Sequence, residues 1–114
     1  MKKTLLLLTF LIATAWCSIQ AQNVNIPDAN FKAYLVGDPA INTNSDSEIS
    51  VAEAQAFSGE LLINGLSISD LTGIEAFVNI TRLDCYSNNL TSLDVSNNLA
   101  LTRLHCSDNQ IETL

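Results

Sequence analysis

Apolar residues recur at fixed offsets in the C-terminal part of the chain. Residues 80–93 align with residues 101–114, and Thr, Arg, Leu, Cys, Asn and Leu are identical at six offsets. Ile and Leu exchange at two more offsets, which gives the shared pattern L-x-x-L-x-C-x-x-N-x-L-x-x-L. A unit of this length cannot bury its own apolar side chains, so the pattern predicts units that stack on one another.

The L-x-C part of each unit predicts a short strand, because alternate side chains of a strand point to opposite faces. Leu83 and Cys85 are therefore expected in the core, as are their counterparts Leu104 and Cys106. An asparagine follows each strand where the chain must turn. Its side-chain amide can satisfy backbone groups inside the turn that no neighbouring strand reaches.

A degenerate third copy lies upstream. Its apolar residues match those of the next unit at a spacing one position longer, and they are Leu61, Ile63, Ile68 and Leu71. The extra residue falls within 72–79, so residues 60–79 are expected to form the first unit. The spacing predicts a right-handed coil of short parallel strands near 61–63, 82–86 and 103–107.

Residues 22–59 do not repeat. Pro27-Asp28 precedes a segment with apolar residues on one helical face, which predicts a helix near 28–36 that ends at Gly37-Asp38-Pro39. A second helix is expected near 51–57, and Ser50-x-x-Glu53 has the spacing of a capping box. We interpret 22–59 as a helical N-terminal cap for the stacked units.

The polar loop 42–53 has the spacing of a twelve-residue EF-hand loop. The expected calcium ligands are side-chain oxygens and one backbone carbonyl, from Asn42, Asn44, Asp46, Glu48 and Glu53. Two features weaken the site: Ser47 stands where a glycine normally makes the sharp turn, and only two formal charges face the ion. The sequence predicts no cofactor and at most weak calcium binding, and a loop that packs without metal is the alternative.

Residues 1–21 have the features of a secretory signal peptide, with Lys2-Lys3, an apolar run and a small residue at the expected cleavage point Ala21. Cys17 fits a lipoprotein signal poorly because Trp16 precedes it. Loss of two of the five basic residues leaves three against twelve acidic ones, a net charge of −9 over positions 22–114. This balance argues against nucleic acid and anionic membranes as partners, and no later segment suits membrane insertion.

Cys85 and Cys106 lie one unit apart at the same core position. Stacked strands would bring their Cα atoms to about 4.8 Å, within the range of a disulfide, although the Cβ vectors would run parallel. Free cysteine packs well in cores, so we favour a ladder of buried thiols over a disulfide.

These features together resemble secreted bacterial leucine-rich repeat proteins. The motifs are Ile-Pro-Asp-Ala-Asn-Phe at 26–31, the EF-hand-like loop, and two cysteine-bearing repeats. The cap is similar in kind to that of internalins, and the cysteine-bearing repeats to those of Bacteroidetes surface proteins. The resemblance implies an α/β leucine-rich repeat solenoid with a small helical cap, divided into 1–21, 22–59 and 60–114. It also implies a protein of the cell surface or the extracellular medium.

Outward-facing strand residues would form the concave surface of such a solenoid. The expected ligand-binding residues are Arg82, Asp84, Tyr86, Arg103, His105 and Ser107. An aromatic residue among arginines and an acid suits recognition of an extracellular protein or glycan. The alternative is that these are solvated strand residues. A further alternative is a non-catalytic N-terminal part of a larger secreted hydrolase or adhesin.

Asp84, His105 and Ser107 invite comparison with a catalytic triad. Residues two apart on one strand lie about 6.6 Å from each other, which predicts that Ser107 is beyond hydrogen-bonding reach of His105. No oxyanion donors are evident, so we expect no enzymatic activity. Because residues 101–114 keep the full internal pattern, we also expect this chain to be part of a longer protein.

Overall fold

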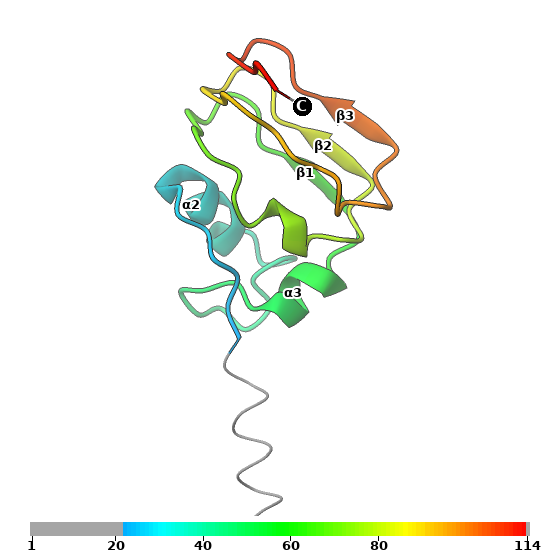
Figure 1. Cartoon of the computed structure of the whole chain (residues 1–114). Coiled ribbons are helices and arrows are strands. Elements are labelled where there is room, and N and C mark those ends of the chain that lie inside the picture. The colour runs from blue at the N-terminus through cyan, green and yellow to red at the C-terminus, as the bar shows by residue number, and fades with distance from the viewer. Residues whose placement is uncertain (1–21, 114) are drawn as a thin grey trace, which may run out of the picture.

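The computed structural model describes residues 22–113, so the predicted signal peptide and Cys17 lie outside the described residues. Three short strands form one parallel sheet in the order β1 (Glu60–Leu62), β2 (Arg82–Asp84) and β3 (Arg103–His105). Glu60 pairs with Arg82, and Arg82 pairs with Arg103. The sequence spacing between paired residues is therefore one position longer from β1 to β2 than from β2 to β3. Figure 1 shows the strands side by side above the helical segment. Parallel pairing at the predicted spacing is confirmed.

Two α-helices precede the sheet, α2 (Ala29–Gly37) and α3 (Val51–Ala56), within one residue of the predicted bounds. Asp28 caps α2 by accepting hydrogen bonds from the backbone N–H groups of Asn30 and Phe31. The predicted capping box of α3 is present, with Ser50 and Glu53 bonded to each other's backbone N–H groups. None of the helices within 22–113 is long and apolar enough to cross a membrane.

A short 3₁₀ helix, η1 (Ile74–Ala76), lies within 72–79, where the extra residue of the first repeat was predicted. The chain enters it through Gly73 at φ +108°, and a Cβ atom there would lie 2.9 Å from the carbonyl oxygen of Asn25. Only glycine permits both this backbone conformation and this close approach. The first repeat thus packs directly against the N-terminal segment.

One hydrophobic core runs from α2 through the first two repeats. Its fully buried side chains include Phe31, Leu35, Leu61, Ile63, Leu83 and Cys85. In the third repeat (101–113), Leu104 and Cys106 are only half-buried. The inward orientation predicted for β2 is confirmed, whereas β3 has the same pattern with only partial burial.

The asparagines after β2 and β3 fill the turns with hydrogen bonds. The amide N–H groups of Asn88 donate to the carbonyls of Ile63 and Cys85. The side-chain oxygen of Asn88 accepts from the backbone N–H groups of Leu66 and Ile68, at 3.0 Å each. Asn109 repeats the arrangement against the second repeat, with Cys85 and Leu90 as partners. The predicted role of these asparagines is confirmed.

Asp28 also joins the N-terminal segment to the first repeat. Its second carboxylate oxygen accepts from the backbone N–H groups of Ser69 and Asp70, at 2.9 and 3.3 Å. Burial acts to raise the pKa of Asp28, but hydrogen bonds from Phe31, Ser69 and two further backbone N–H groups outweigh it and lower the pKa. One carboxylate thereby fixes a helix start and a repeat turn together.

Candidate functional site

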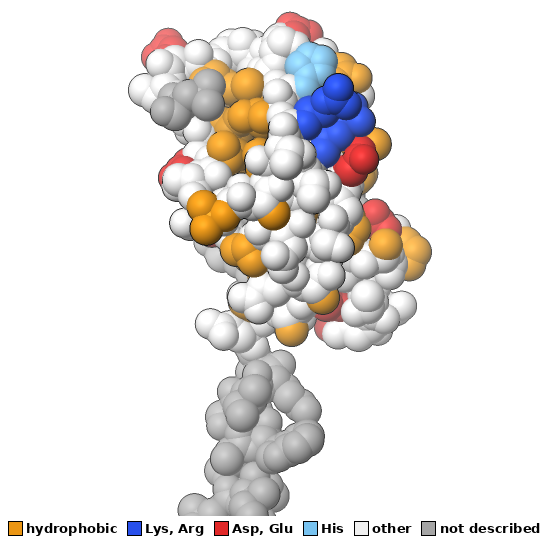
Figure 2. Space-filling view, turned by 90° about the vertical axis from the view of Figure 1, so that its right-hand side faces the viewer, with side chains coloured by type: hydrophobic (Ala, Val, Ile, Leu, Met, Phe, Trp, Pro, Cys, Tyr) orange, Lys and Arg blue, Asp and Glu red, His pale blue; other side chains and the backbone are white. Residues whose placement is uncertain are grey.

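The six predicted ligand-binding residues lie on the outer face of the sheet, which we call the sheet face. The register places Arg82 beside Arg103 and Asp84 beside His105. The ladder continues past the strands, because the Ser87 N–H donates to the Ser107 carbonyl at 3.1 Å, which brings Tyr86 next to Ser107. Figure 2 shows Arg and His side chains of this region grouped together on one side of the molecule. The predicted residues are thus neighbours in the structure.

Arg82 and Asp84 form a closed ion pair on this face. Nε and Nη2 of Arg82 donate to the two Asp84 oxygens at 3.0 and 2.6 Å, and Nη1 reaches Glu60 at 3.3 Å. The hydrogen bonds from Arg82 lower the pKa of Asp84, with the charges of Arg82, His105 and Arg103 acting in the same direction. Asp84 is only 5% exposed, so its carboxylate orders Arg82 and is covered by it.

Tyr86, His105 and Ser107 form a second group. The rings of Tyr86 and His105 stack with centroids 4.4 Å apart and an angle of 29° between their planes. Nε2 of His105 lies 2.9 Å from the Ser107 hydroxyl oxygen. The expectation that Ser107 is out of reach was wrong, because a long imidazole side chain leans along the strand and shortens the Cα separation. The stack and the hydrogen bond hold the imidazole in one orientation.

This contact does not complete a catalytic triad. Both carboxylate oxygens of Asp84 accept hydrogen bonds from Arg82. In the described part of the chain, Asp84 forms no hydrogen bond with His105. The serine and histidine also lie on an exposed strand face, where developing charge would meet water in place of preorganised donors.

Two residues of the sheet face were missed by the sequence interpretation. Glu60 pairs with Arg82, and Leu62, opposite Asp84 in the register, is 45% exposed. Applying the inward–outward alternation to the degenerate first repeat, with its longer spacing, would have found both. The sheet face therefore extends over all three strands.

The EF-hand-like loop is closed by its own hydrogen bonds. Oδ1 of the Asn44 side chain accepts from the Asp46 N–H, and the Asp46 carboxylate accepts from the Glu48 N–H and from the side-chain amide of Asn44. Glu53 accepts from Ser50, Thr43 and the Asn44 backbone. Burial acts to raise the pKa of Glu53, but these hydrogen bonds outweigh it and lower the pKa. Internal donors thus occupy the carboxylates predicted to bind calcium.

Asn42 is the exception in this loop. Its amide donates to the carbonyls of Val36 and Asp46, while its own side-chain oxygen is buried without a hydrogen-bond partner. Glu48 turns its carboxylate to the Lys32 ammonium at 2.9 Å. Residues 22–113 contain no group of three or more His, Cys, Asp or Glu side chains arranged to hold a metal ion.

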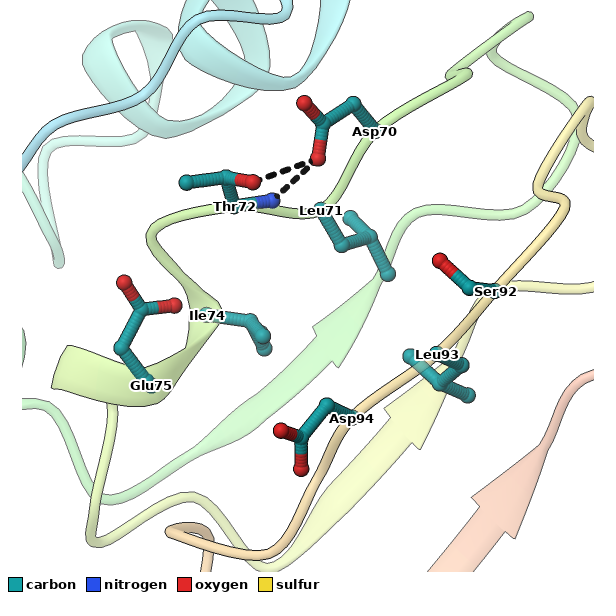
Figure 3. A pocket seen from close by; sticks show the side chains of 8 residues that line it. All are labelled: Asp70, Leu71, Thr72, Ile74, Glu75, Ser92, Leu93 and Asp94. Carbon is teal, nitrogen blue, oxygen red and sulfur yellow. Dashed lines mark hydrogen bonds between the residues drawn. The ribbon is translucent and has the colours of Figure 1, made fainter. Parts of the chain in front are cut away.

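The segment of each repeat that leads back from the strand and its turn is called the return limb. A cavity of about 270 Å³ lies between the return limbs of the first two repeats, at residues 70–75 and 92–94, away from the sheet face. Figure 3 shows its acidic side chains, Asp70, Glu75 and Asp94, coming from both limbs. Each carboxylate accepts a hydrogen bond from its own turn, from Thr72, Gly73 and Ser96 respectively. The acids therefore stabilise turns, and their arrangement offers no further chemistry.

Cys85 and Cys106 are both free thiols. Burial raises the pKa of the Cys85 thiol to about 12, and the neighbouring Cys106 and Asp84 add to this effect. A thiol of this kind is inert packing material in the core.

The fold of this chain is similar to that of internalins, which are leucine-rich repeat proteins. Internalin J of Listeria monocytogenes is 37% identical over 81 residues, which is 69% of this chain and 8% of the relative. No protein-family model matches the chain.

Solved structures that share the fold include the following three. Internalin InlF of L. monocytogenes superposes with a TM-score of 0.63 at 25% identity, covering 75% of this chain and 25% of that one. A functional domain of InlJ that includes a cysteine ladder gives 0.59 at 32% identity, covering 82% and 23%. The CBM51-2 and INT domains of Clostridium perfringens ZmpB give 0.56 at 23% identity, covering 72% and 17%. The chain spans a quarter or less of each.

Proposed function

We propose that this chain is a non-catalytic binding module that recognises an extracellular protein or glycan through its sheet face. The observation that carries the proposal is the Tyr86–His105 stack, held by Ser107 and bordered by Arg103 on an exposed sheet. A rigid aromatic pair beside polar groups is typical of binding surfaces. The similarity to internalins supports this class of function and an extracellular or cell-surface location.

The architectural part of the proposal is a right-handed coil, in which residues 22–59 cap the repeats of 60–114 and residues 1–21 direct secretion. Parallel strands joined by crossover connections are right-handed in about 98% of cases. The contacts of Asp28 and Gly73 with the first repeat support the capping role.

Calcium, in this proposal, binds the loop 42–53 weakly or not at all. A bound ion would have to displace the internal donors of Asp46 and Glu53, whereas Glu48 was predicted to contribute its backbone carbonyl. Among the predicted side-chain ligands, the oxygen of Asn42 is buried without a hydrogen-bond partner. We expect a dissociation constant on the order of 10⁻⁴–10⁻³ M, at the weak end of the EF-hand range, measured by calorimetry.

A second candidate is that the chain serves as the recognition part of a larger secreted hydrolase or adhesin. The observation that supports it is the sequence match to internalin J, a longer protein of which this chain spans 8%. Recognition through the sheet face is common to both candidates, so one binding experiment tests them.

The experiment measures binding of the full chain to arrays of immobilised glycans and extracellular proteins. The double variant Tyr86→Ala/His105→Ala removes the stack, and Thr91→Ala/Ser92→Ala changes two exposed return-limb residues as a control. We expect the first to weaken binding about tenfold or more and the second to leave it unchanged. Equal affinity in the two variants, with both folded by circular dichroism, would contradict the proposal.

A further inference from the structure

The second and third repeats differ at one informative position of the sheet face. The second carries Arg82-Leu83-Asp84, and the third carries Arg103-Leu104-His105. In the second repeat, the carboxylate two residues after the arginine closes on its guanidinium at 2.6 Å. In the third, the imidazole of His105 replaces that carboxylate, so the arginine loses its internal acceptor.

Arg103 therefore has an open guanidinium. It is exposed, and within residues 22–113 it makes no ion pair. The nearest carboxylate across the sheet, that of Asp84, already gives both oxygens to Arg82. An arginine fork with no acceptor of its own matches the geometry of an external carboxylate.

The residues beside Arg103 form an ordered aromatic pair. Tyr86 and His105 stack at 4.4 Å, and the Ser107 hydroxyl lies 2.9 Å from the imidazole. The flat apolar face of a sugar ring can pack on an outer ring face of this pair, and its hydroxyls can bond to the serine and the imidazole. The patch covers a few side chains, which suits a single monosaccharide more than an extended polypeptide.

The charge of the whole chain limits the class of anion. Of the three basic residues after position 21, Arg82 is held by two carboxylates and Lys32 by Glu48. Only Arg103 lacks a partner within 22–113, on a chain with twelve acidic residues. Such a surface repels polyanions, whereas one isolated carboxylate within a Debye length of about 8 Å of Arg103 is attracted.

We propose that Arg103, beside the stacked Tyr86–His105 pair, binds the carboxylate of an acidic sugar carried on an otherwise neutral glycan. This rests on the proposed binding function of the sheet face and names the ligand class of that site. Arg103 supplies the charge contact, an outer ring face of the stacked pair contacts the sugar face, and Ser107 offers a hydroxyl at the edge.

The test titrates the full ¹⁵N-labelled chain with 3′-sialyllactose, lactose and a short glutamate-containing peptide, followed by NMR. We expect saturable shifts on the sheet face with 3′-sialyllactose and none with lactose. Arg103→Gln should weaken binding about tenfold or more. Lys32→Gln changes the net charge equally at a distant ion pair and should have no effect. His105→Asp restores the arrangement of the second repeat, closes Arg103 internally, and should also abolish binding.

Several outcomes would overturn the inference: equal binding of lactose, equal losses in Lys32→Gln and Arg103→Gln, or no saturable shift with sialyllactose. Tighter binding of the acidic peptide would assign the surface to a protein partner and overturn the assignment to a sugar. If array ligands bind through the sheet face while sialyllactose does not, the proposed function stands and this inference fails. If neither binds there, both fail.

Discussion

The second and third repeats share the leucine, cysteine and asparagine of the repeat pattern, but these residues differ in burial. Leu83 and Cys85 are fully buried, whereas Leu104 and Cys106 are half-buried. Strand β2 pairs on both sides, and β3 pairs only with β2 within the described residues. The burial of a repeat therefore depends on its neighbours more than on its own sequence. The comparison predicts that equal substitutions in the two repeats have unequal effects.

The largest contrast concerns the two thiols. Because the pKa of Cys85 is about 12, only about one thiol in 10⁴ is ionised at pH 8. We expect Cys85 to react with iodoacetamide on the order of 10³ times more slowly than Cys106, which is partly exposed. Timed alkylation with peptide mapping measures both rates, and denaturant should equalise them. Equal rates in the folded chain, or a bridged Cys85–Cys106 peptide, would contradict the ladder of free thiols.

The next contrast is a core truncation in each repeat. Leu83→Ala should lower the free energy of unfolding by about 3–4 kcal/mol, since it leaves a cavity between two neighbours. Leu104→Ala removes the equivalent side chain from a half-buried position and should cost about 1 kcal/mol. Denaturant unfolding of the two variants gives the difference. Similar losses would mean that the third repeat is covered in solution.

The turn asparagines provide a polar version of the same comparison. Asn88→Ala strands buried backbone groups of two repeats, including those of Ile63 and Ile68, and should cost about 2–3 kcal/mol. Asn109 is partly exposed, so water can replace its bonds, and Asn109→Ala should cost about 1 kcal/mol. Urea midpoints at constant slope would measure both. An equal cost would show that exposure does not set the value of these hydrogen bonds.

The smallest effect concerns the end of the stack that is covered by the N-terminal segment. Asp28→Asn keeps one acceptor oxygen for α2 but loses charge and weakens the bonds to Ser69 and Asp70, which should cost about 1 kcal/mol at pH 7.

The pH dependence of Asp28 has a defined sign. Because its pKa is lowered in the folded state, the stabilisation is complete above the ordinary carboxyl pKa and is lost as the pH falls through the folded value. Asp28→Asn should therefore flatten the acid side of the stability curve. Asp94→Asn is the matched comparison: the pKa of Asp94 is lowered as well, but only by hydrogen bonds from Ser96 in its own turn, so we expect a smaller flattening. If the two variants flatten the curve equally, the joint with the first repeat is not the cause.

The repeat spacing was sufficient to predict most of the fold. Strand positions, parallel pairing and the role of Asn88 all follow from the alternation of apolar residues and from the cost of unpaired backbone groups. The pattern within the third repeat predicts the same burial for Leu104 as for Leu83, and the difference arises because β3 has only β2 as a neighbouring strand among the described residues. The sequence also did not predict that the segment containing the extra residue of the first repeat forms the 3₁₀ helix η1.

The candidate site was predicted as a set of residues but not as a set of contacts. All six lie together, yet Asp84 is covered by Arg82, and His105 reaches Ser107. Both contacts join residues two apart on one strand face, where Cα spacing is a poor guide to where long side chains end. Arg82 is paired with Asp84 in its own strand, whereas Arg103 makes no ion pair within residues 22–113.

The hydrogen bonds of the asparagines give the stack a direction. Asn88 bonds to the first repeat through Ile63, Asn98 to the same repeat through Ile74, and Asn109 to the second through Cys85. Each of these asparagines donates to a carbonyl group that precedes it in the sequence. The hydrogen-bond partners of a repeat therefore lie in the part of the protein that is synthesised first. Growth from the N-terminus can then proceed one layer at a time, with every new layer docking on a finished template.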